Sequence, residues 1–117
     1  MPHCIIEYSK SLEHSLSINE LVGSVHRGAL ASGLFEEGDI KTRAIPYACF
    51  QIGTVQHSSA SFVHVAVRLL AGRSVSQKTK LSDAVLQSIR ELNAQIGSIT
   101  VEVVDMAIES YAKSVLE

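Results

Sequence analysis

Pro2 is the residue with the most distinctive chemistry, at the start of the strand-like run Pro2-His3-Cys4-Ile5-Ile6-Glu7-Tyr8. If Met1 is removed, Pro2 carries a free secondary amine, which no other residue type supplies at a chain end. The pyrrolidine ring fixes φ, so the nitrogen would be held stiffly at the end of the strand. Such an amine could act as a base or as a nucleophile. The competing interpretation is structural, because proline is also tolerated as the first residue of a strand.

Three cations form the second candidate part of a site, namely Lys41, Arg43 and Arg73. Lys41 and Arg43 alternate with other residues along an extended run, so they share one face of the predicted strand. Arg73 lies where a strand-like run gives way to a helix. Its guanidinium could hold a carboxylate there in a two-pronged contact, beside helix N-terminal amides that also favour anions. Taken singly, however, each cation is typical of an ordinary solvated surface.

The sequence lacks the other common catalytic patterns. Its histidines include no pair with metal-ligand spacing on one element, and they are His3, His14, His26, His57 and His64. There is no glycine-rich phosphate loop, no GxSxG motif and no CxxC motif. We therefore expect a chemistry that requires neither a metal ion nor an organic cofactor.

Composition narrows the class of protein. The 117 residues suit a single domain over 1–117, and with 46% hydrophobic and 19% charged residues a packed core is expected. A mean hydropathy of +0.21 is high for a small monomer and suggests that apolar surface is buried between subunits. The formal net charge of −2 and the lack of a Lys/Arg run argue against nucleic-acid binding. An anionic substrate would therefore be attracted by a local cluster of cations rather than by the overall field.

The cellular location is predicted from what the chain lacks. No apolar run approaches the roughly 18 residues of a membrane span, so we expect no membrane contact. No secretory signal accompanies Cys4 and Cys49, and we expect both to be buried free thiols. These features predict a cytoplasmic protein.

The first half of the chain has the pattern of a strand, a helix and a second strand. A strand is expected over residues 2–8. The capping box Ser17-Ile18-Asn19-Glu20 predicts a helix start, and Gly33 suits the helix end, where a left-handed residue is favoured. An extended run over 39–52 follows, and Pro46 within it predicts an edge strand, a bulge or two short strands.

The second half repeats this order. A strongly β-like run covers residues 61–70, and the capping box Ser74-Val75-Ser76-Gln77 then predicts a long helix that Gly97 would end. A final strand is expected over 99–104. The residues from 106 to 117 could add a short terminal helix.

The two halves, about 1–58 and 59–117, give the order β-α-β-β-α-β. With right-handed crossovers this order predicts an α+β fold, a four-stranded sheet with two helices on one face. The strands are interpreted as apolar on both sides. The uncovered face of the sheet should then pack against another subunit.

These features resemble the tautomerase superfamily. In that superfamily a short strand leads into a Gly-Arg-Ser turn and a helix, and loss of the initiator methionine exposes a catalytic proline. The smallest members are a single β-α-β unit, and a fused chain that begins Pro-His resembles the 5-carboxymethyl-2-hydroxymuconate isomerases. The matching segments are Pro2-His3, Lys41-Thr42-Arg43, Phe62-Val63-His64 and Ala71-Gly72-Arg73-Ser74.

The resemblance implies a homotrimer in which each fused chain stands in for two small subunits. It implies that Pro2 is the general base and that Arg73 and Arg43, together with Lys41, bind the carboxylates of a small anionic substrate. The implied enzyme is a cofactor-independent isomerase, an intramolecular oxidoreductase. It would move a proton and a double bond in an unsaturated hydroxy or keto di- or tricarboxylate in the catabolism of aromatic compounds.

Two departures from the family pattern bear on the substrate. Lys41 stands where arginine is expected, and lysine keeps the charge but loses the planar fork. The tail from Met106 to Lys113 lacks the expected proline and the aromatic-lysine stretch that leads into asparagines. It could line the pocket or lock the trimer.

Two alternatives stay open. The first is an enzyme of the same fold that acts on a different unsaturated keto acid, such as a promiscuous dehalogenase-like hydratase. The second is a ferredoxin-like module that binds a ligand without catalysis, since the same order of elements occurs in such domains.

Overall fold

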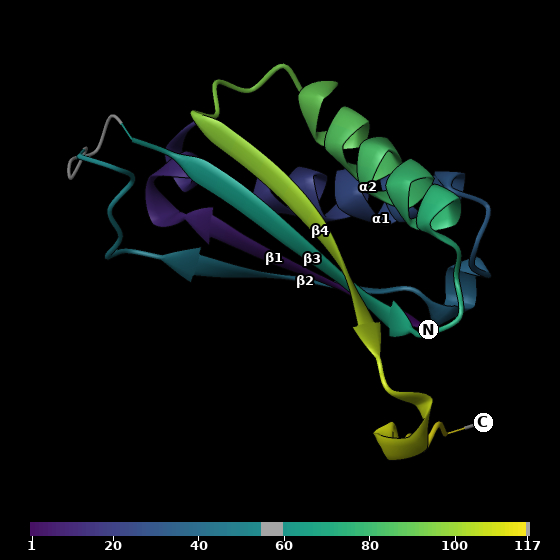
Figure 1. Ribbon diagram of the computed structural model, residues 1–117. Helices are drawn as coiled ribbons and strands as arrows, with labels where there is room; N and C mark the ends of the chain where they lie inside the picture. Colours follow the sequence, from purple (N-terminus) through teal and green to yellow (C-terminus); the bar gives the residue numbers. More distant parts are fainter. Residues whose placement is uncertain (55–59, 117) are drawn as a thin grey trace.

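The computed structural model describes residues 1–54 and 60–116 and contains one four-stranded sheet with the strand order β2-β1-β3-β4 (Figure 1). β1 is parallel to β2, β3 is parallel to β4, and the two pairs join where β1 runs antiparallel to β3. The strands are β1 (Pro2–Ser9), β2 (Lys41–Tyr47), β3 (Phe62–Leu70) and β4 (Ser98–Met106). The predicted α+β fold with the order β-α-β-β-α-β is therefore confirmed.

Two helices, α1 (Ile18–Ala31) and α2 (Val75–Arg90), lie together on one face of this sheet (Figure 1). The core fills the layer between helices and sheet, because alternate residues of each central strand point toward the helices. Its fully buried members include Ile6 of β1, Val65 of β3, Val25 of α1 and Val85 of α2. This layer holds the first residues of β1 in a fixed position, and Pro2 itself is buried.

Serine caps start both helices, as the sequence predicts. Ser17 Oγ accepts a hydrogen bond from the Glu20 amide at 3.3 Å. In α2 the full capping box forms, since Ser74 Oγ accepts from the Gln77 amide at 3.1 Å and Gln77 Oε1 accepts from the Ser74 amide at 2.9 Å. The second box fixes the turn that carries Arg73 into α2.

The end of α2 differs from the prediction, because the helix stops at Arg90 and Gly97 does not terminate it. Asn93 takes the left-handed conformation instead, with φ 54°. Asparagine tolerates this conformation better than most residues do. Gly97 serves a different purpose, since its amide donates to Ser61 Oγ at 2.8 Å and a Cβ there would lie 2.9 Å from the Ser61 carbonyl oxygen.

The predicted terminal helix is also wrong. After β4 the chain makes one 3-10 turn at Ile108–Ser110 and then continues without regular structure to residue 116.

β2 is shorter than the predicted run over 39–52, although Pro46 does lie within this edge strand. Residues 55–59 of the predicted loop, His57 among them, lie outside the described residues.

The face of the sheet that the helices leave open carries both apolar and charged side chains. The expectation of strands apolar on both sides is therefore wrong, although Ile45 and Tyr47 are 43% and 37% exposed. The charged groups on this face bond to their neighbours. Tyr47 Oη donates to Glu7 at 2.6 Å, and His64 Nε2 lies 2.6 Å from Glu102 Oε2.

The two cysteines differ in burial. Cys4 is a buried free thiol, as predicted, whereas Cys49 is free but exposed. Across residues 1–54 and 60–116, no helix has the length and apolar character that a membrane crossing needs.

Candidate active site

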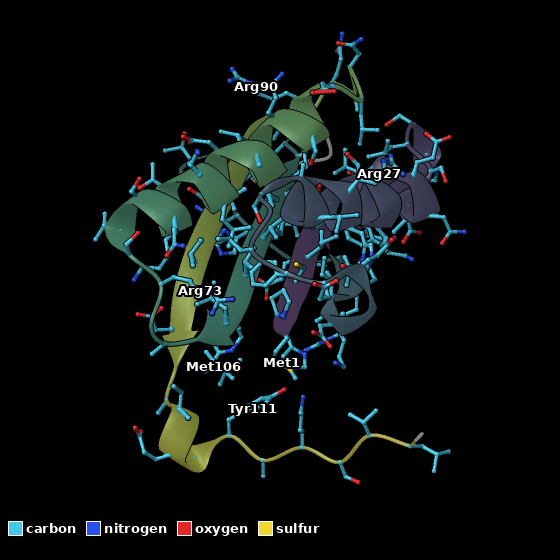
Figure 2. The ribbon with its side chains drawn as sticks, turned by 90° about the vertical axis from the view of Figure 1, so that its right-hand side faces the viewer. Met1, Arg27, Arg73, Arg90, Met106 and Tyr111 are labelled. Carbon is cyan, nitrogen blue, oxygen red and sulfur yellow. The ribbon has the colours of Figure 1, made fainter. Side chains whose placement is uncertain are left out.

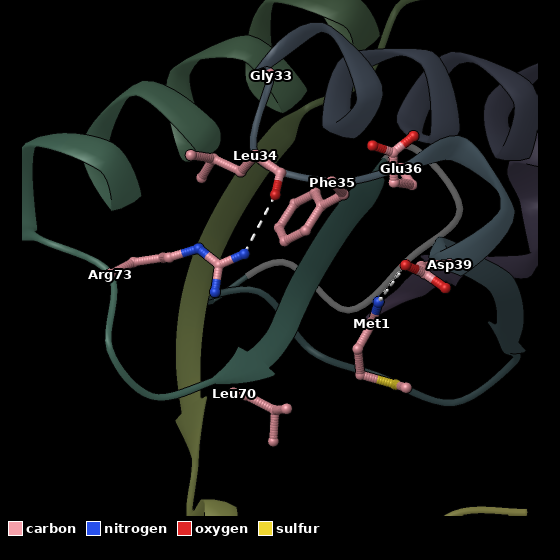
Figure 3. Close-up of a pocket in the computed structure, with 8 residues that line it drawn as sticks. All are labelled: Met1, Gly33, Leu34, Phe35, Glu36, Asp39, Leu70 and Arg73. Atoms are coloured by element: carbon pink, nitrogen blue, oxygen red, sulfur yellow. Dashed lines mark hydrogen bonds and ion pairs between the residues drawn. The ribbon is translucent and has the colours of Figure 1, made fainter.

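A cavity of ≈ 290 Å³ lies at the N-terminal end of β1, directly beside Met1 (Figure 3). It forms where three parts of the fold meet: the start of β1, the loop between α1 and β2, and the turn between β3 and α2. Its lining consists of Met1, Gly33, Leu34, Phe35, Glu36, Asp39, Leu70 and Arg73. Pro2, the next residue after Met1, is paired with Leu69 of β3 and is not itself among the lining residues.

Arg73 is the cation in the lining of this cavity. Its Nη2 donates to the Leu34 carbonyl oxygen at 3.1 Å, and its guanidinium carbon lies 5.6 Å from the centre of the Phe35 ring. Gly72 precedes it with φ +130°, a conformation that other residue types rarely adopt. The contact with Leu34 uses one of the five N–H donors of the guanidinium. The remaining donors can bind a carboxylate, as the sequence analysis expects.

The chain's terminal amine lies at the other side of the cavity, where Met1 N is 3.8 Å from Asp39 Oδ2. Burial is the largest influence on this amine and lowers its pKa below the ordinary value. Asp39 opposes that effect. Three cations lower the pKa further, namely Lys41, Lys113 and Arg73. The surroundings therefore favour a neutral amine, which is the form that can accept a proton.

Lys41 and Arg43 lie on β2, on the open face of the sheet, paired with His3 and Ile5 of β1. Neither residue lines the cavity, although the charge of Lys41 acts on the terminal amine. Arg43 Nη1 donates to His3 Nδ1 at 3.2 Å. The structure therefore places Arg73 and Met1, the neighbour of Pro2, in the lining of one cavity. Lys41 lies within electrostatic range of the terminal amine, and Arg43 is bonded to His3, which is outside the lining.

His3 and Tyr111 form a second contact around Met1 that the sequence analysis did not foresee. His3 Nε2 lies 2.9 Å from Tyr111 Oη, which donates to Met1 Sδ at 2.6 Å. Burial is the main cause of a lowered His3 pKa, with Arg43 and Lys41 adding to it, so the imidazole favours its neutral form. Figure 2 shows Tyr111 on the tail that follows β4, next to Met1.

The sequence analysis also missed Phe35, Glu36 and Asp39, since it named no site residue between Gly33 and Lys41 and gave position 39 only as the start of an extended run. An aromatic residue and acidic residues on a loop between two elements are a signal of a site, since loops often carry functional residues.

Among the described residues, no group of three or more His, Cys, Asp or Glu side chains could hold a metal ion.

A family model described as 5-carboxymethyl-2-hydroxymuconate isomerase matches residues 2–114. The chain belongs to this family. It is therefore an isomerase with the tautomerase fold, which decides against the alternative of a non-catalytic ferredoxin-like module. The family resemblance stated from the sequence is confirmed.

Known relatives agree with this assignment. A 5-carboxymethyl-2-hydroxymuconate Delta-isomerase of Escherichia coli is 28% identical over 90 residues, which are 77% of this chain and 71% of that protein. The crystal structure of a 5-carboxymethyl-2-hydroxymuconate isomerase from Deinococcus radiodurans R1 is 26% identical, with a TM-score of 0.79 over 97% of this chain and 88% of the other. A crystal structure of a 5-carboxymethyl-2-hydroxymuconate delta-isomerase gives a TM-score of 0.83 at 19% identity, covering 98% of this chain and 88% of the other.

A further solved structure of this fold is that of a fused protein. The protein described as "Q0 fused 4-OT wild type symmetric trimer" has a TM-score of 0.69 at 17% identity, over 90% of this chain and 85% of the other. At this identity the likeness shows a shared fold.

Proposed function

We propose that this isomerase acts on an unsaturated hydroxy or keto di- or tricarboxylate of the 5-carboxymethyl-2-hydroxymuconate type, with Pro2 as the general base. The observation that supports the proposal is the arrangement at the end of β1. Met1 lines the cavity, Pro2 follows Met1 directly in the chain, and Arg73 extends into the same cavity from the turn before α2 (Figure 3). Removal of Met1 would enlarge the cavity and place the Pro2 amine at its wall.

The Pro2 amine would take up a proton in its neutral form. An ordinary α-amino group has a pKa of about 7.7–8.0 and is largely protonated at pH 7. Burial and the charges of Lys41, Lys113 and Arg73 lower the pKa of the Met1 amine, and we expect the same surroundings to act on Pro2. A pKa nearer neutrality is the value that suits a general base.

The reaction moves one proton and one double bond. The Pro2 nitrogen takes a proton from an enol hydroxyl or from an acidic carbon, which leaves a dienolate. The proton then returns from Pro2 to another carbon of the conjugated system, so that the product has the same atoms as the substrate. The protein needs to hold the carboxylates and to stabilise the negative charge of the dienolate between these steps.

Arg73 is proposed to bind one substrate carboxylate through the donors that Leu34 does not use. Lys41 and Arg43 would contribute further positive charge from β2. Glu36 and Asp39 line the same cavity and would repel a carboxylate placed on their side. The substrate's carboxylates would therefore be directed toward Arg73.

We propose a homotrimer in which the open face of the sheet is covered by neighbouring subunits. The apolar side chains of this face, including Ile45 and Tyr47, support its burial. So does the fused trimer that shares this fold.

A cytoplasmic location and a place in the catabolism of aromatic compounds are part of the same proposal.

The proposal is tested by following ketonisation and isomerisation of hydroxymuconate-type diacids with the wild-type chain, Pro2→Ala and Arg73→Ala. Both variants are expected to lose activity, whereas Arg90→Ala, a change of an exposed arginine at the far end of α2, should not. Unchanged rates in both Pro2→Ala and Arg73→Ala would contradict the proposal.

A second candidate is an isomerase of this fold that acts on a different unsaturated keto acid. Lys41 favours it, because lysine cannot form the planar two-pronged contact that arginine makes with a carboxylate. Comparing 2-hydroxymuconate, a dicarboxylate, with its 5-carboxymethyl derivative, a tricarboxylate, separates the two candidates.

A further inference from the structure

Tyr111 joins a chain of hydrogen bonds that starts on β2 and ends at Met1. Arg43 Nη1 lies 3.2 Å from His3 Nδ1, His3 Nε2 lies 2.9 Å from Tyr111 Oη, and Tyr111 Oη lies 2.6 Å from Met1 Sδ. Three separate parts of the chain meet here, namely β2, the start of β1 and the tail after β4.

The chemistry of Arg43 sets the direction of these bonds. A guanidinium can only donate, so His3 Nδ1 must be the acceptor of the first bond. A neutral imidazole that accepts at Nδ1 carries its proton on Nε2. His3 Nε2 therefore donates to Tyr111 Oη, and the hydroxyl proton of Tyr111 is left to point at Met1. The lowered pKa of His3, caused mainly by burial and next by Arg43, agrees with a neutral ring.

The Tyr111 hydroxyl donates its proton to the side chain of Met1. The proposed function requires that Met1 be removed. A thioether sulfur is a weak acceptor. When Met1 is absent, the Tyr111 hydroxyl still accepts from His3 and faces the space that Met1 occupied. That space adjoins Pro2 and the cavity that contains Arg73.

We propose that the Tyr111 hydroxyl donates a hydrogen bond to the substrate oxygen that becomes negatively charged when Pro2 removes a proton. The phenol keeps its own proton throughout, so the step changes no bond other than this hydrogen bond. Tyr111 is then a catalytic residue, whereas His3 and Arg43 are positioning residues that act through it. The inference rests on the proposed function, because it places the substrate in the space vacated by Met1.

Donors of this kind stabilise the transition state more than the bound substrate. Tyr111→Phe is therefore expected to lower kcat about 100-fold, the lower end of the loss that follows removal of one donor to a developing oxyanion. KM should change little. Tyr8→Phe is the matched control, because Tyr8 also donates a 2.6 Å bond, to Glu13, and lies at the opposite end of β1 from Met1.

A double-mutant cycle tests the connection between His3 and Tyr111. His3→Ala should lower kcat in the wild-type chain, because Tyr111 loses the bond that orients it. The same change should have almost no further effect in the Tyr111→Phe background. His3→Gln, which retains a side-chain N–H, should restore part of the rate that His3→Ala loses.

Two results would overturn the inference: a kcat for Tyr111→Phe within about twofold of the wild-type value, or equal effects of His3→Ala in both backgrounds. Measuring Pro2→Ala in the same series separates this inference from the proposed function. If Pro2→Ala loses activity and Tyr111→Phe does not, only the role of Tyr111 fails. If Pro2→Ala retains the wild-type rate, both proposals fail.

Discussion

At the scale of single residues, the site is defined by groups that act on the terminal amine with opposite signs. Burial and the cations lower the amine pKa, whereas the Asp39 carboxylate, 3.8 Å away, raises it. These groups act on the Met1 amine, and we expect them to act in the same way on the Pro2 amine, the proposed base, once Met1 is removed. Asp39 and Arg73 are therefore the residues whose substitution should have the most specific effects.

Asp39→Asn should shift the acidic limb of the kcat/KM profile to lower pH. The amine is inactive while it is protonated, so activity rises as the pH passes through its pKa. The Asp39 carboxylate raises the pKa of the Met1 amine. We expect its removal to lower the pKa of the Pro2 amine in the processed chain for the same reason. A pH series of kcat/KM measures the shift, and Asp83→Asn, an exposed change on α2, is the control. A shift to higher pH would contradict this account of the amine.

Arg73→Ala should weaken substrate binding by about 10- to 100-fold in KM, because a hydrogen bond to a charged group contributes roughly 1.5–3 kcal/mol. Arg73→Lys should recover only part of this loss, since lysine cannot bind a carboxylate with a planar fork. Steady-state kinetics of both variants measure the difference. If lysine restored the wild-type KM, Arg73 would be acting as a simple point charge.

Two residues of the site could be predicted from the sequence, and others could not. Pro2 and Arg73 stand next to strong local signals, namely the start of a strand and a capping box. Met1, the neighbour of Pro2, lines one cavity together with Arg73, and the catalytic roles of Pro2 and Arg73 stay predictions. The bond between His3 and Tyr111 joins residues 108 positions apart, and no local pattern indicates such a contact. Asp39 was missed because its role depends on the folded position of Met1.

At the scale of elements, the two helices approach closely at Gly28. A Cβ on Gly28 would lie 2.6 Å from Ser88 Oγ and 3.0 Å from the backbone Cα of Val85 on α2. The backbone atom cannot move aside cheaply, so this glycine allows α1 and α2 to pack together over the sheet. The order of elements was predictable from capping boxes and periodicity, whereas this close approach depends on how the helices pack in space.

Gly28→Ala is expected to lower the free energy of unfolding by about 1–3 kcal/mol, as overpacking of a core does. Gly23→Ala in the same helix is the matched control, because a Cβ there meets only the flexible end of Arg27. That control should gain about 0.5–1 kcal/mol, since alanine favours a helix more than glycine does. Urea denaturation at one fixed protein concentration measures both. A gain of stability in both variants would show that the helices do not pack as described.

At the scale of the whole molecule, the open face of the sheet connects the fold to the proposed assembly. The helices leave this face uncovered (Figure 1), and it contains exposed apolar side chains among partnered charges. The sequence analysis predicted that one face of the sheet is uncovered, but it interpreted the strands as apolar on both sides. Lys41 and Arg43, which the sequence analysis placed together on one face of a strand, lie on this open face.

The wild-type chain should have a mass in solution of about 38 kDa, three times the 12.6 kDa of one chain. Ile45→Lys, a change on the open face, should shift this toward the monomer because it buries a charge in the proposed interface. Val75→Lys changes a residue that is 77% exposed on α2 and should not. Light scattering coupled to size exclusion measures the mass. A wild-type monomer, or an Ile45→Lys variant that remains trimeric, would contradict the proposed interface.

The removal of Met1 is the step on which the proposed chemistry depends, and it can be tested without any substitution. Two preparations of the same chain, one with Met1 retained by inhibition of methionine aminopeptidase and one with Met1 removed, are distinguished by intact mass. The processed chain should isomerise the diacid, and the chain that retains Met1 should be at least about 100-fold slower, because general base catalysis contributes 10²–10⁴-fold. Equal kcat/KM values for the two preparations would contradict the assignment of Pro2 as the base.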